Sequence, residues 1–125
     1  MTTTKLVKTL FGYIRLETCA EEAIKILNYL KSSGGRDTED VNDALRIIKN
    51  FDVFYEMMKK KFKDYIAPRK SEVDLIRGRV TVDKIKLSKN GTKRVIIILD
   101  KRVSEELITK ALEHLGIKYE LESEV

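Results

Sequence analysis

Few side chains in this sequence are of the types that catalysis or metal binding requires. There is one cysteine, Cys19, and one histidine, His114, so no site can be built from several Cys and His ligands. His114 has no serine, cysteine or second histidine at a spacing typical of a general base and its nucleophile. We therefore expect His114 to be either a surface residue or one whose hydrogen bonds are satisfied within the fold, and Cys19 to pack as a small apolar side chain near a helix start.

Two short polar groups are candidates for ion binding. One is the acidic cluster Asp37, Glu39, Asp40 and Asp43, which has suitable ligands for a divalent cation, although carboxylates at a helix start are explained more simply by the helix dipole. The other is 100–104, where Lys101 and Arg102 precede Ser104 at the end of an apolar run. No glycine-rich phosphate motif accompanies it, so we expect Ser104 to be an N-cap. The sequence predicts no enzyme, no metal site and no cofactor.

The positive charge of the chain is concentrated in its middle. Residues 59–102 contain 15 Lys and Arg against 5 Asp and Glu, whereas residues 1–58 have a net charge of −1 and residues 103–125 of −4. Basic side chains that neutralise phosphates release counterions, which gives salt-dependent binding. We predict a nucleic-acid site made of Lys59, Lys60, Lys61, Lys63, Arg69, Lys70, Arg77, Arg79, Lys84, Lys86, Lys89, Lys93 and Arg94. Phe62 and Tyr65 are candidates for stacking on bases, although we expect Phe62 in the core.

The leading hypothesis is a nucleic-acid-associated accessory protein that binds electrostatically, with weak sequence dependence. By analogy alone, it would be a subunit of a larger nucleoprotein complex of the CRISPR, replication or transcription type. The sequence does not distinguish DNA from RNA as the partner. It lacks the aromatic signature of an RNA-recognition sheet and the Gly-x-x-Gly clamp of a KH domain.

Three other hypotheses stay open. The chain is alternatively a protein-interaction or oligomerisation module, whose N-terminal helices present apolar and aromatic side chains to a partner or a second copy. It is also compatible with a winged-helix-like DNA-binding regulator, with a hairpin at Asn90-Gly91 as the wing. In the third, the lysines form an ordinary solvated face or pair with the acidic tail Glu120, Glu122 and Glu124.

The first half of the chain has helical periodicity. Apolar residues between Leu6 and Ile14 predict a helix over residues 4–16. Thr18 and Glu21 have the form of a capping box for a second helix, which the sequence 32–35 (Ser-Ser-Gly-Gly) should end. A third helix should begin near Thr38 and either continue to Ile66 or break near Asp52.

The second half changes to strand periodicity. We predict a strand over 79–88, a two-residue turn at Asn90-Gly91 and a strand at 95–99 covered on both faces. A helix capped by Ser104 follows, and Gly116 should end it. A right-handed crossover would then place a last strand, 117–122, parallel to 95–99 and beside it.

The predicted fold class is therefore α+β: an N-terminal bundle of three or four helices (1–67) followed by a β-β-α-β unit with an Asn-Gly hairpin (68–125). Pro68 marks the boundary, and the two halves are expected to pack as one domain, since 125 residues fit one core. The charged fraction of 36% and the absence of Gln resemble thermophile proteins. No signal peptide or membrane span is recognisable, so we expect a cytoplasmic protein without a membrane partner.

Overall fold

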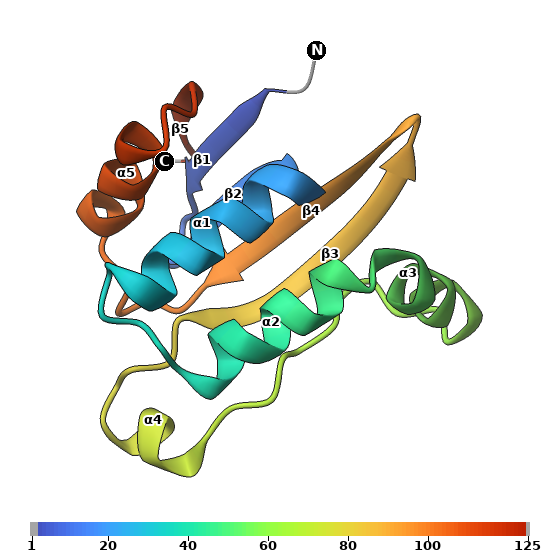
Figure 1. Ribbon diagram of the computed structural model, residues 1–125, viewed down its shortest axis with the longest axis horizontal. Helices are drawn as coiled ribbons and strands as arrows, with labels where there is room; N and C mark the ends of the chain where they lie inside the picture. Colours follow the sequence, from blue (N-terminus) through green and yellow to red (C-terminus); the bar gives the residue numbers. More distant parts are fainter. Residues whose placement is uncertain (1–2, 125) are drawn as a thin grey trace.

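A computed structural model describes residues 3–124. Helices pack against one face of a five-stranded sheet, and the other face has no helix on it (Figure 1). The elements in chain order are β1 (Thr4–Lys8), β2 (Ile14–Cys19), α1 (Ala20–Ser32), α2 (Glu39–Lys49), α3 (Phe51–Lys60), α4 (Glu72–Ile76), β3 (Val82–Asn90), β4 (Thr92–Leu99), α5 (Glu105–His114) and β5 (Tyr119–Ser123).

The strand order is β3-β4-β2-β1-β5. All neighbouring pairs are antiparallel except β1 and β5, which are parallel. The core lies between the sheet and the helices and includes Leu16 of β2, Leu27 of α1, Ile47 of α2, Ile97 of β4 and Leu112 of α5. Strands from both sides of Pro68 share this sheet and this core.

The predicted N-terminal helix bundle is wrong, because residues 4–16 form β1, a turn and the start of β2. Leu6 pairs across the strands with Leu16, and Gly12 has the positive φ (87°) that the turn between them requires. Leu10 and Phe11, which gave the segment its helical spacing, are exposed at that turn. The burial of β2 alternates residue by residue, which is the strand period that the prediction overlooked.

The boundaries of the central helices also differ from the prediction. Thr18 caps no helix, since it is buried in β2 with its hydroxyl 2.9 Å from that of Thr4, and Cys19 occupies the N-cap of α1. A helix does begin after Thr38, and the chain breaks at Asn50 into α2 and α3. Helix α3 ends at Lys60, well before Pro68, and the short helix α4 had no recognised signal.

The second half has the predicted order of elements but a different pairing. Strand β5 is parallel to β4 in direction, yet β2 and β1 lie between them, so the crossover spans the N-terminal hairpin. The β3–β4 hairpin is centred on Gly91, with Lys89 opposite Lys93, which differs from the register of a two-residue turn. The Ser104 hydroxyl accepts the Leu107 N–H at 3.2 Å, and Gly116 ends α5 with φ 69°.

A buried carboxylate joins α2 to β3. The side chain of Asp40 is fully buried, and its Oδ2 accepts the backbone N–H groups of Thr81 and Val82 at 2.8 and 2.6 Å. These two hydrogen bonds fix the position of the start of β3 relative to α2, and therefore the positions of the side chains along β3. Between residues 3 and 124, no helix is long and apolar enough to cross a membrane.

Candidate nucleic-acid interface

The structure distributes the predicted cationic residues over three places. The first is the end of α3 together with the middle of β3, where α3 lies beside the outer edge of that strand (Figure 1). The second is the tip of the β3–β4 hairpin, with Lys89, Lys93 and Arg94. The third is the irregular segment around α4, with Arg69, Lys70, Arg77 and Arg79. The predicted site is thus divided, and the three groups differ in what their charges contact.

Lysines from α3 and β3 converge on one hollow of about 380 Å³. Two buried side chains, Met58 and Leu87, form part of its wall. The remaining lining residues are Tyr55, Lys59, Phe62, Lys63, Asp64 and Lys86. A concave apolar wall with a rim of ammonium groups can accept an anion that also has an apolar part.

Tyr65 links this hollow to a further lysine. Its neighbour Ile66 exchanges two backbone hydrogen bonds of 2.8 Å with Ile85, which fixes the segment against the edge of β3. The Tyr65 ring centroid lies 4.7 Å from Nζ of Lys84 and 6.0 Å from Nζ of Lys86. We call Lys59, Lys63, Lys84 and Lys86 the α3–β3 lysine surface.

The charges of this surface are not neutralised by carboxylates. Within residues 3–124 none of its four lysines forms an ion pair, although Asp64 lies on the rim of the hollow. The ring contacts of Lys59 with Tyr55 (5.5 Å) and of Lys84 with Tyr65 position the ammonium groups and leave their charge in place. Lys60 and Lys61 follow on the same helix end and are exposed.

Phe62 is the one residue of this region whose placement contradicts the prediction. We expected it in the core, because its spacing continues the apolar stripe of Phe51, Tyr55 and Met58. The helix ends at Lys60, however, and the Phe62 side chain is 96% exposed. Whether Phe62 is buried or exposed depends only on where α3 ends. In the sequence, the run Lys59–Lys61 is the sole indication of this helix end, and it is a weak one.

Several predicted cations instead hold the fold together. Lys70 donates from Nζ to the carbonyl of Asp83 at 2.8 Å, and Arg79 donates to the carbonyl of Gly35 at 3.2 Å. Arg94 donates to the carbonyl of Thr3 at 3.0 Å. Arg69 lies 3.7 Å from Asp43, while Arg77 is exposed at the end of α4. Binding by the first three would require internal contacts to break.

The hairpin tip is held by one aspartate. The ammonium groups of Lys89 and Lys93 lie 3.3 and 3.0 Å from the carboxylate of Asp52 on α3. Hydrogen bonds from Lys93 and then Lys89 lower the pKa of Asp52 below its ordinary value. The tip therefore presents less free positive charge than its sequence suggests.

The acidic tail does not neutralise the basic segment. Glu122 pairs with Lys5 at 3.6 Å and Glu124 pairs with Arg15 at 3.4 Å, so the partners come from β1 and β2. Strand β5 lies at the opposite edge of the sheet from β3. The acidic tail and the basic strand β3 therefore lie at opposite edges of the sheet.

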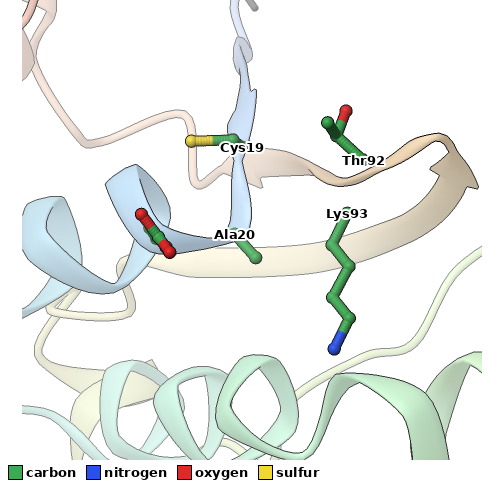
Figure 2. A pocket seen from close by; sticks show the side chains of 5 residues that line it. Cys19, Ala20, Thr92 and Lys93 are labelled. Atoms are coloured by element: carbon green, nitrogen blue, oxygen red, sulfur yellow. The ribbon is translucent and has the colours of Figure 1, made fainter.

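Cys19 and His114 lie near opposite ends of α1, since Cys19 is its N-cap and His114 contacts Tyr29 close to its C-terminal end. Cys19 lines a hollow of about 360 Å³ with Ala20, Glu21, Thr92 and Lys93, but its thiol and the Lys93 ammonium point in different directions (Figure 2). The register explains this, since Arg94 is opposite Cys19 and adjacent residues face opposite sides of a strand. His114 lies 4.9 Å from the ring of Tyr29 and is exposed.

The acidic cluster serves the fold. Asp40 accepts the two backbone N–H groups of β3, and Asp43 accepts the N–H of Arg69 and a guanidinium N–H of Arg46, each at 2.8 Å. No group of three or more metal-ligating side chains is found in the described part of the chain. Asp40 and Asp43 thus hold α2 against the segments that lead into β3.

A pH-dependence follows from Asp43. Burial raises the pKa of this carboxyl, but hydrogen bonds from Arg69 and Arg46 more than offset it and hold the pKa below its ordinary value. The stabilisation is therefore fully present above the unfolded-state pKa of about 3.9 and is lost as pH falls through the lower folded-state value. We expect Asp43→Asn to lower the free energy of unfolding by roughly 1.5–3 kcal/mol at neutral pH.

Urea denaturation of the wild type and Asp43→Asn at several pH values measures this effect. The difference between them should shrink steadily as pH falls below about 4. A difference that is the same at neutral and acidic pH would show that the charge of Asp43 contributes nothing.

Two alternative hypotheses, an interaction module and a winged helix, each imply a particular arrangement of the helices or of the hairpin. The apolar faces of α1 and α2 pack on the sheet and Phe51 of α3 is 3% exposed, whereas Val53 of α3 is 69% exposed. The hairpin is no separate wing, because β4 is an interior strand of the sheet. Other exposed apolar residues are Leu10 and Phe11 at the β1–β2 turn, and Val73, Leu75 and Ile76 on α4.

We compared the chain with models of protein families, with curated proteins and with solved structures, and none of them matched.

Proposed function

We propose that this protein binds nucleic acid through the α3–β3 lysine surface. The observation that carries the proposal is the convergence of Lys59, Lys63 and Lys86 on one hollow, with Lys84 joined to it through Tyr65. Unpaired lysines that lie together are the electrostatic footprint of a phosphate-binding surface.

The mechanism is electrostatic and weakly dependent on sequence. Lysine carries a compact charge on a flexible stem, so it contacts phosphates without the fixed fork that lets arginine read a base edge. Each contact displaces condensed counterions from the nucleic acid, and the entropy of their release drives binding. The same rule makes the affinity fall as salt rises.

The proposed biological role is that of an accessory subunit. Non-specific affinities based on phosphate contacts alone lie at about 10⁻⁴–10⁻⁶ M at physiological salt. With only four lysines, the affinity of this surface should lie at the weak end of that range. Weak binding is sufficient for a subunit of a nucleoprotein complex, because its contacts add to those of the other subunits.

Titration of short labelled DNA and RNA oligonucleotides, at about 50 mM salt, tests the proposal by fluorescence anisotropy. We expect saturable binding of both polymers. Failure of every oligonucleotide to bind at this salt would contradict it.

Replacing Asp52 by asparagine should strengthen binding. Asp52 competes with phosphates for Lys89 of β3 and Lys93 of β4, and Lys89 lies three residues, about 10 Å, along β3 from Lys86. Freeing the equivalent of one phosphate contact should raise the affinity up to about tenfold at about 50 mM salt.

The matched control is Glu56→Gln, which removes one exposed carboxylate from the same helix but no ion pair among residues 3–124. Anisotropy titrations should show a larger gain for Asp52→Asn than for this control. Equal gains would indicate a general charge effect and would remove the hairpin tip from the interface.

A further inference from the structure

Phe62 combines two features that do not stabilise the fold. Its ring is 96% exposed, so it buries almost no apolar surface. Its backbone has a φ of 53°, in the left-handed region that favours glycine and that bulky side chains rarely adopt. It follows α3 at the position where glycine is the usual residue.

The backbone around Phe62 is nevertheless well held. The N–H of Lys63 donates to the carbonyl of Met58 at 3.0 Å, and the N–H of Phe62 donates to that of Lys59 at 3.3 Å. These bonds close the end of α3 and fix the direction in which the ring leaves the chain. An aromatic side chain has few rotatable bonds, so little entropy is lost when it contacts a ligand.

The faces of the Phe62 ring are open. Lysines lie over the rings of Tyr55 and Tyr65, whereas no ring or cation contacts that of Phe62 within residues 3–124. Phe62 lies between Lys59 and Lys63 in the chain and lines the same hollow as Lys86. A planar apolar group of an anionic polymer would find a ring to stack on and ammonium groups beside it.

We propose that the partner is a single-stranded nucleic acid, one base of which stacks on Phe62 while Lys59, Lys63 and Lys86 contact the flanking phosphates. This inference rests on the proposed function and narrows its substrate class. In a duplex the base faces are already stacked on one another, whereas single strands expose them. Stacking is tolerant of sequence, because every base has an aromatic face.

Phe62→Gly separates a binding role from a structural one. Glycine adopts the positive φ without strain, so we expect the thermal unfolding midpoint to rise by about 3 °C. Loss of one stacked base should weaken binding of oligo-dT and oligo-U by roughly 5- to 100-fold. Binding of duplex DNA should change less than about twofold, because Phe62 has no charge that could neutralise a phosphate.

Two further variants complete the test. Phe62→Tyr keeps an aromatic face and should retain single-strand affinity. Phe11→Gly removes another exposed phenylalanine, at the β1–β2 turn away from the lysines, and should leave the affinity unchanged. Comparison of oligo-dT with oligo-U shows whether DNA or RNA is the better source of the stacked base.

The outcomes distinguish this inference from the function on which it rests. Unchanged single-strand affinity of Phe62→Gly, or a wild type that prefers duplex DNA, would overturn the stacking proposal and leave electrostatic binding in place. No binding of any probe would overturn both.

Discussion

Replacing Asp40 by alanine should lower the free energy of unfolding by about 3–5 kcal/mol. The carboxylate is completely buried and accepts two backbone N–H groups of Thr81 and Val82. Alanine would leave both donors buried without partners, and each such donor costs roughly 1–3 kcal/mol. Chemical denaturation followed by circular dichroism measures the loss.

Glu39→Ala is the appropriate control, because Glu39 precedes Asp40 in the same first helical turn but is exposed. Its removal should cost less than about 1 kcal/mol, the usual size of a helix-dipole contribution. A similarly small loss for Asp40→Ala would mean that α2 and β3 are held together by apolar packing alone.

The second large effect concerns binding. Changing Lys59, Lys63, Lys84 and Lys86 together to glutamine should weaken nucleic-acid affinity by on the order of a hundred- to a thousandfold at about 50 mM salt. Each single-strand phosphate contact contributes about −0.7 to the slope of log affinity against log salt. Four contacts together therefore raise the affinity by a large factor at low salt. The fold should be retained, because none of the four lysines makes an ion pair within the described residues.

The matched control removes the same number of charges elsewhere. Lys25, Lys31, Lys110 and Lys118 are exposed and lie on α1, on α5 and before β5, away from the β3 edge of the sheet, and Lys110 pairs with the exposed Glu106 at 3.2 Å. Their replacement by glutamine changes the net charge equally. Equal losses in the two variants would show that binding follows net charge and has no site.

The sequence identifies the second half of the fold better than the first. Turn and cap residues have local physical meanings, so Gly91, Ser104 and Gly116 predict their elements without knowledge of the rest of the chain. The β1–β2 hairpin lacks a comparable signal. Its strands are short, and Leu10 and Phe11 of the turn complete a helical spacing although they are exposed.

Strand neighbours are a global property that periodicity does not contain. A crossover from β4 predicts the direction of β5 correctly, because handedness is local to the connection. It does not reveal that the first hairpin occupies the positions between those strands. Which strands become neighbours depends on how all helices and strands of the chain together bury their apolar faces.

The candidate site could be predicted only as a region of charge. Composition locates the basic segment, but only the structure shows that Lys70, Arg79 and Arg94 bind backbone carbonyls, while the four lysines of the α3–β3 lysine surface form no ion pair within residues 3–124. Pairing of Asp52 with Lys89 and Lys93 joins residues far apart in sequence, which no spacing rule predicts.

The salt dependence of wild-type binding to a single-stranded oligonucleotide is the sharpest test of whether the α3–β3 lysine surface binds nucleic acid. If the α3–β3 lysine surface engages phosphates, a plot of log affinity against log salt should be linear with a slope of about −3, since four contacts each contribute about −0.7. A slope near zero, or no binding at the lowest salt, would contradict nucleic-acid binding by this surface.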